Sequence, residues 1–147
     1  MALRCNPVLI AALMALAGCQ AGGKPDVPGD PGSPAAFDGI GVDEEVRFLG
    51  NEPFWGGSAR GATLTYTTSE DPAGQTIPVK RFGGRGGLSL SGTIAGKAFD
   101  MTITPGACSD GMSDRGYPFV VTLRIADETR NGCGWTSRQP FTGPASP

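Results

Sequence analysis

The chain contains no histidine, and this absence excludes more classes of function than any other feature of its composition. Without histidine there is no Ser-His-Asp or Cys-His catalysis, no HExxH zinc protease and no imidazole pH sensor in the neutral range. Positive charge is also scarce, because 12 Lys and Arg stand against 14 Asp and Glu in 147 residues. The net charge of −2 argues against nucleic acid as a partner, since phosphate binding requires a basic face.

The motifs of nucleotide binding and of serine catalysis are missing as well. The segment Gly92–Lys97 has three residues between its glycines where a P-loop has four, and Ala98 stands where the Ser or Thr belongs. Neither a GxSxG nucleophile elbow nor an SxxK dyad occurs. We therefore expect no nucleotide and no other cofactor.

The N-terminus has the pattern of a bacterial lipoprotein signal. Arg4 precedes an apolar run, Val8 to Ala17, that is too short to span a bilayer as a helix. The following Leu16-Ala17-Gly18-Cys19 resembles the lipobox, in which the thiol receives a diacylglyceryl thioether before cleavage. We expect a signal peptide over residues 1–18 and a lipidated Cys19 bearing acyl chains such as palmitate. The alternative is an ordinary secretory signal with a cysteine there by chance.

Residues 19–42 read as a tether between the lipidated cysteine and a folded domain. Four prolines and several glycines interrupt this segment, and no apolar periodicity offsets the entropy of ordering it. Gln20, and not Asp, follows the cysteine, so resemblance to other bacterial lipoproteins favours the outer membrane, facing the periplasm. Residues 142–147 read as a flexible tail.

Residues 43–141 read as an all-β domain. Phe99, Met101 and Ile103, for example, alternate with polar residues, as in antiparallel strands with one solvated face. No stretch free of glycine and proline carries the apolar stripe of a helix. Six to eight short strands favour a small antiparallel barrel, with a sandwich as the alternative.

Residues that favour turns lie between the alternating stretches. Ala95-Gly96 predicts a tight hairpin, Asp71–Gly74 a turn, and Gly83–Gly87 a flexible connection. Pro78 lies within an alternating stretch, and because proline cannot donate to a ladder it predicts an edge strand.

Cys108 and Cys133 are expected to form a disulfide, since an exported chain meets an oxidising compartment. Closing a loop of about 25 residues stabilises a fold by about 3.5 kcal/mol in the chain-entropy model. The bridge would pin the loop from Ala107 to Gly116 to the last strand. A free reactive pair is the alternative.

The turn Gly50–Trp55 (GNEPFW) is the first candidate site. Glu52, Phe54 and Trp55 place a carboxylate beside two aromatic rings, and aromatic anchors dominate binding hot spots. The interpretation that the residues favour is a structural role, in which the rings close one end of the barrel and Glu52 caps a turn.

The second candidate site is the loop after Cys108, which carries Asp110, Asp114, Arg115 and Tyr117. The two carboxylates have the chemistry of Ca²⁺ ligands, but the alternating ligand pattern of an EF-hand is missing, so we expect no metal. They also have the chemistry of a general acid and base in glycoside hydrolysis. An internal network with Arg115 or the backbone is the structural alternative.

The EPFW turn, the string C-SDGMSDR-YPF and the late Gly132-Cys133 together resemble a family of small bacterial envelope lipoproteins. The resemblance covers Val46 to Trp135. Members sometimes accompany META/HslJ-like or lysozyme-inhibitor-like domains, which are also small and rich in β-structure. The resemblance implies an envelope location and an all-β fold, and it brings no activity.

We therefore expect a non-enzymatic, lipid-anchored periplasmic binding module, whose partner is an envelope protein such as a cell-wall hydrolase; inhibition of a lysozyme is the sharpest version. Its face would combine Glu52, Trp55, Asp110, Asp114 and Arg115. One alternative is a structural or stress-related envelope component without a specific ligand. The other is a carboxylate-based hydrolase, with two carboxyl groups about 5–9.5 Å apart in a cleft.

Overall fold

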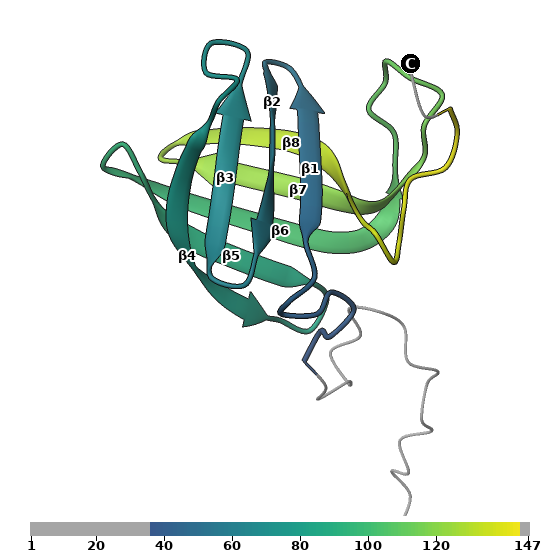
Figure 1. Cartoon of the computed structure of the whole chain (residues 1–147), viewed down its shortest axis with the longest axis horizontal. Helices are drawn as coiled ribbons and strands as arrows, with labels where there is room; N and C mark the ends of the chain where they lie inside the picture. The colour runs from purple at the N-terminus through teal and green to yellow at the C-terminus, as the bar shows by residue number, and fades with distance from the viewer. Residues whose placement is uncertain (1–35, 145–147) are drawn as a thin grey trace, which may run out of the picture.

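The computed structural model describes residues 36–144, which form eight strands and no helix (Figure 1). None of the described residues therefore belongs to a helix capable of crossing a membrane. The expected signal peptide, Cys19 and most of the expected tether lie outside this range. The strands are β1 (Val46–Asn51), β2 (Phe54–Arg60), β3 (Thr63–Thr68), β4 (Gln75–Gly83), β5 (Leu88–Ile94), β6 (Lys97–Cys108), β7 (Tyr117–Ile125) and β8 (Glu128–Thr136).

Each strand pairs antiparallel with the next, and β8 returns to pair with β1, so the sheet closes into a barrel. The prediction of an antiparallel barrel is confirmed, and the sandwich alternative is wrong. The closed sheet gives the apolar sides of the alternating strands one common interior.

The hydrophobic core inside the barrel is formed by side chains of strands β1 to β7, together with Ile40. Phe48, Leu64, Leu90 and Met101 are each at most 2% exposed, and burying such a side chain contributes about 1.5–3 kcal/mol. Four aromatic rings succeed one another in this core, with centroid separations of 5.9, 6.2 and 5.9 Å; in order they are Phe48, Trp55, Tyr66 and Phe99.

The predicted hairpin at Ala95-Gly96 is confirmed. Ile94 pairs with Lys97, and Ala95 and Gly96 have φ angles of 48° and 76°, the left-handed values that a two-residue type I′ turn requires. The turn between β3 and β4 is confirmed as well, where the Asp71 carboxylate accepts the Gly74 amide at 3.1 Å.

The prediction that Pro78 marks an edge strand is wrong, because a closed barrel has no edge strand. Residues 75–78 of β4 register with β3, whereas residues 79–83 register with β5. Neighbouring strands of a tilted barrel are staggered in this way. Pro78 is therefore paired with β3 and not with β5, so the N–H group that proline lacks is not needed for pairing with β5.

Residues 37–44, called the N-terminal strap here, cross the lower end of the barrel in Figure 1 and close it. Ile40 is 3% exposed within the core cluster, and Phe37 packs against that cluster. The Arg81 guanidinium donates to the carbonyls of Ile40 and Gly41, at 2.5 and 3.2 Å. Contacts with the barrel thus begin within the segment expected to be a tether.

Glu44 fastens the end of the strap to the residues that follow β8. Its carboxylate forms an ion pair with Arg138 and accepts the Gly41 amide at 3.1 Å. The hydrogen bond from Arg138 is the largest cause of a pKa lowered to about 2 for Glu44. The charge on Glu44 therefore persists across the physiological pH range and keeps the strap attached.

Two glycines allow β1 and β8 to cross closely. The register between these strands ends at Leu49 and Cys133, and the next residues are Gly50 and Gly132. A Cβ atom on Gly132 would lie 2.1 Å from the Leu49 carbonyl oxygen, and one on Gly50 would lie 2.1 Å from Nε1 of Trp55. Glycine at both positions therefore lets the strands approach and leaves room for the indole.

We expect Gly132→Ala to lower the free energy of unfolding by about 2–3 kcal/mol, because the added methyl group meets backbone that cannot move independently. Gly106→Ala is the matched control, since the nearest atom to its added Cβ is a Val120 methyl group at 3.5 Å. Urea unfolding of both variants measures the difference. Equal stabilities would contradict the role given to the crossing.

Candidate functional site

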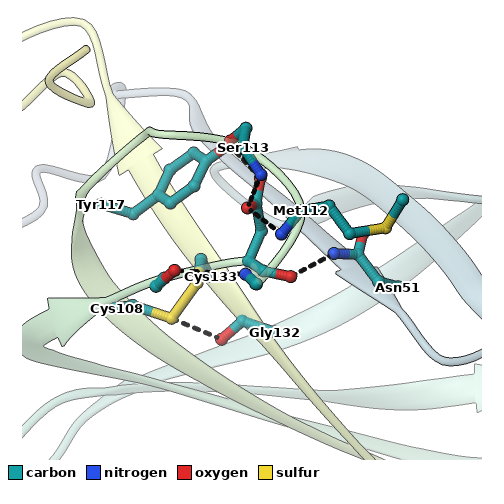
Figure 2. Close-up of a disulfide and its surroundings, with 10 residues drawn as sticks. Asn51, Cys108, Met112, Ser113, Tyr117, Gly132 and Cys133 are labelled. Atoms are coloured by element: carbon teal, nitrogen blue, oxygen red, sulfur yellow. Dashed lines mark hydrogen bonds between the residues drawn. A yellow bond between two sulfur atoms is a disulfide. The ribbon is translucent and has the colours of Figure 1, made fainter. Parts of the chain in front are cut away.

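The disulfide between Cys108 and Cys133 is present, as predicted, with the two Cα atoms 5.6 Å apart (Figure 2). Cys108 ends β6, whereas Cys133 lies in β8 and is 1% exposed. The bridge therefore fixes one end of the loop between β6 and β7, residues 109–116, to the last strand. The predicted pinning of this loop is confirmed.

Asp110 organises the loop from within. Its Oδ1 accepts the amides of Met112 and Ser113, at 3.0 and 2.8 Å, and its Oδ2 accepts the hydroxyls of Ser113 and Tyr117, at 2.7 and 3.1 Å. Aspartate favours such turns because its short side chain reaches the backbone two or three residues ahead. The internal network considered from the sequence is therefore present, with backbone and hydroxyl donors rather than Arg115.

These donors determine the protonation state of Asp110. The Ser113 amide is the largest cause of a pKa lowered to about 2 for Asp110. Asp110 is therefore an anion at neutral pH, and both of its oxygens are engaged. A general acid in glycoside hydrolysis needs the opposite, a raised pKa and a proton to donate.

Asn51 joins the loop to the other candidate segment, the turn between β1 and β2. Its side-chain amide donates a short hydrogen bond to the Asp110 carbonyl, across 59 residues of sequence (Figure 2). The two candidate segments are therefore neighbours in space. Sequence reasoning missed Asn51, because its role depends on a contact that no local pattern reports.

Trp55 and Tyr117 are buried and do not offer a surface for binding. Trp55 is 4% exposed, and its ring packs between Phe48 and Tyr66 in the core. Tyr117 is 2% exposed and packs on the outer cluster formed with Trp135 and Phe141, at centroid separations of 5.5 and 5.8 Å. Of the two interpretations of Trp55, its position matches the structural one.

Arg115 attaches the chain after β8 to the loop. Its guanidinium carbon lies 4.6 Å from the centroid of Phe141, a cation–π geometry, and its Nε donates to the Pro144 carbonyl at 2.9 Å. Gly116 and Thr142 also form an isolated antiparallel bridge. Residues 142–144, expected to be flexible, thus contact the loop.

The joined segments expose two large apolar and two acidic side chains, and we call these four the loop–turn face: Glu52, Phe54, Met112 and Asp114. Phe54 is 54% exposed and Met112 68% exposed, while Glu52 and Asp114 contribute two negative charges. Met112 was not singled out from the sequence, although its place in the specific SDGMSDR string marked the loop.

Within residues 36–144, no group of three or more Cys, Asp or Glu side chains is arranged to hold a metal ion. No protein-family model, no curated protein and no solved structure matches the chain. The resemblance to envelope lipoproteins therefore stays a prediction.

The loop should lose its order in acid when Asp110 is protonated. Because the pKa of Asp110 is about 2, below its ordinary value of 3.8, its hydrogen bonds add stability above pH about 4. This contribution should disappear as the pH falls from about 4 to 2. The NMR signals of the Met112 and Ser113 amides report the change.

Asp110→Asn should reproduce that loss at neutral pH, since it weakens the charge-assisted hydrogen bonds and should speed exchange of these amides by about tenfold. Asp114→Asn is the control, because its side chain is exposed. Unchanged amide exchange in Asp110→Asn would show that Asp110 does not organise the loop.

Proposed function

We propose that this protein is a lipid-anchored binding module of the bacterial envelope, held through Cys19 on the periplasmic side of the outer membrane. Its partner is a protein, and the loop–turn face is the binding surface. Inhibition of a cell-wall hydrolase such as a lysozyme is the specific form of this proposal. The observation that carries it is the exposure of Phe54 and Met112, at 54% and 68%, on two segments that are joined to each other.

Rigid presentation supports this function. The loop is held at its base by the disulfide, inside by Asp110 and at its side by Asn51. A loop ordered before binding loses little conformational entropy when it meets a partner. Exposed apolar side chains in such a setting suit insertion into a partner's groove, where a few residues contribute most of the affinity.

The charge of the face points to the kind of partner. Glu52 and Asp114 lie two residues from Phe54 and Met112 in the sequence, respectively, and neither forms an ion pair within 4.0 Å among the salt bridges of the described residues. Arg115, the neighbouring cation, is engaged with Phe141 and Pro144. A groove with basic residues at its rim would complement this arrangement and would raise the rate of association.

The alternatives receive less support. A carboxylate-based hydrolase needs a carboxylic acid that is protonated near neutral pH, and the low pKa of Asp110 does not provide one. A structural component without a ligand has no use for exposed apolar side chains on an ordered loop. Single exposed apolar residues are common on protein surfaces, whereas here two are exposed on joined segments. We therefore retain the binding module.

The test is an activity assay of c-type and g-type lysozymes titrated with the full chain, purified with its anchor in a mild detergent. We expect stoichiometric inhibition by the wild-type protein. The double variant Phe54→Ser, Met112→Ser should weaken inhibition by at least about 100-fold, since two anchors of about 2 kcal/mol each are removed.

Phe82→Ser is the matched control, because Phe82 is as exposed as Met112 but lies on β4, away from the face. This variant should inhibit like the wild type. Inhibition that survives the double variant would disprove the assigned face. Absence of inhibition by the folded wild-type protein would disprove the hydrolase-inhibitor form of the proposal.

A further inference from the structure

The lower end of the barrel differs chemically from the loop–turn face. The N-terminal strap runs across this end, from the connection after β4, where the Phe37 amide donates to Gly84, to the turn after β2, where the Gly61 amide donates to Val42. In Figure 1 the strap lies at the bottom, while the turn between β1 and β2 lies at the top. Chain that precedes residue 36 therefore joins the domain at the lower end.

Positive charge collects at the lower end. This end has six basic side chains and four acidic ones, the latter being Asp38 and residues 43–45. The rest of the described chain has four basic and eight acidic side chains. The domain is thus positive at one end and negative over the remainder. The six basic residues are Arg47, Arg60, Lys80, Arg81, Arg85 and Arg138.

Two large apolar side chains are exposed among these charges. Val42 is 63% exposed in the strap, and Phe82 is 68% exposed near the end of β4. Neither side chain belongs to the hydrophobic core cluster or packs against it. Basic residues interspersed with exposed apolar ones are the composition that binds the interface of an anionic bilayer.

We propose that the lower end of the barrel, formed by the strap and the connection after β4, docks on an anionic lipid surface. Val42 and Phe82 enter the headgroup region, and the net positive charge of this end attracts the anionic headgroups. Within the domain, Arg47 and Arg60 pair with Glu45 and Arg138 pairs with Glu44, so the attraction comes from the excess of basic over acidic side chains. The loop–turn face is then held away from the bilayer, free to meet a partner. This inference rests on the proposed membrane anchor and not on the identity of the partner.

The chain outside the described residues fits this arrangement. From Cys19 to Ala36 is 17 residues, which average about 23 Å as a flexible coil and reach about 53 Å as polyproline II. Either length lets a lipidated Cys19 stay in the bilayer while the lower end rests on its surface. A tether joined to the opposite end would have to pass along the barrel first.

The experiment uses the full chain with its anchor, reconstituted into vesicles of phosphatidylglycerol or of phosphatidylcholine. Hydrogen exchange is followed by mass spectrometry. On phosphatidylglycerol, we expect amides of residues 38–44 and 83–87 to exchange at least about threefold more slowly than on phosphatidylcholine. Amides of residues 109–116 should exchange equally on both, and 0.5 M salt should reduce the difference.

Two variants test which groups cause the protection. We expect the difference in amide exchange between the two kinds of vesicle to disappear in the double variant Val42→Ser, Phe82→Ser. The same loss is expected in a second double variant, Arg60→Glu, Lys80→Glu. The control is the double variant Phe54→Ser, Met112→Ser, in which this difference in exchange should be unchanged. Because Val42 and Phe82 are exposed, their replacement is expected to leave the fold intact, and the exchange of core amides checks this.

Several outcomes would overturn the proposal. Equal exchange of the lower end on both lipids would disprove docking, even if the chain stays anchored. Protection of residues 109–116 instead would reverse the orientation. A chain that leaves both kinds of vesicle would disprove the anchor and the docking together. Failure to inhibit a hydrolase would leave the docking result standing, because the two faces are tested by different variants.

Discussion

The close crossing of β1 and β8 is the contact on which the architecture depends. Seven of the eight strand pairings join neighbours in the sequence, and only this one joins the two ends of the sheet. Gly50 and Gly132 let the backbones approach where the register ends, and Trp55 lies against the crossing from inside the barrel. Without this closure the apolar faces of the strands would have no common interior.

The disulfide extends the same crossing to the outer surface. Cys133 is opposite Leu49, in the last registered pair of β1 and β8, and its bridge brings the loop after β6 to that point. Asn51, two residues beyond Leu49, then reaches the loop at Asp110. One place in the barrel therefore supports both the closure of the sheet and the candidate binding face.

The lower end of the domain and the rest of its surface carry opposite net charges. The lower end is net positive and includes the residues nearest the N-terminal segment, whereas the remaining surface, with the loop–turn face, is net negative. An anionic bilayer and a basic partner would attract opposite ends of such a molecule. The binding function and the orientation proposed here are thus two consequences of one distribution of charge.

By itself, the sequence determined the all-β class and the hairpin at Ala95-Gly96, because alternation and turn residues act locally. It also determined the disulfide, because Cys108 and Cys133 are the two cysteines of the folded domain. It also marked both candidate segments. Only the tertiary structure decided which of their side chains face water: Trp55 and Tyr117 are buried, while Met112 is exposed. The physical reason is that burial depends on strand stagger and on contacts between distant residues, such as Asn51 with Asp110, which no local pattern encodes.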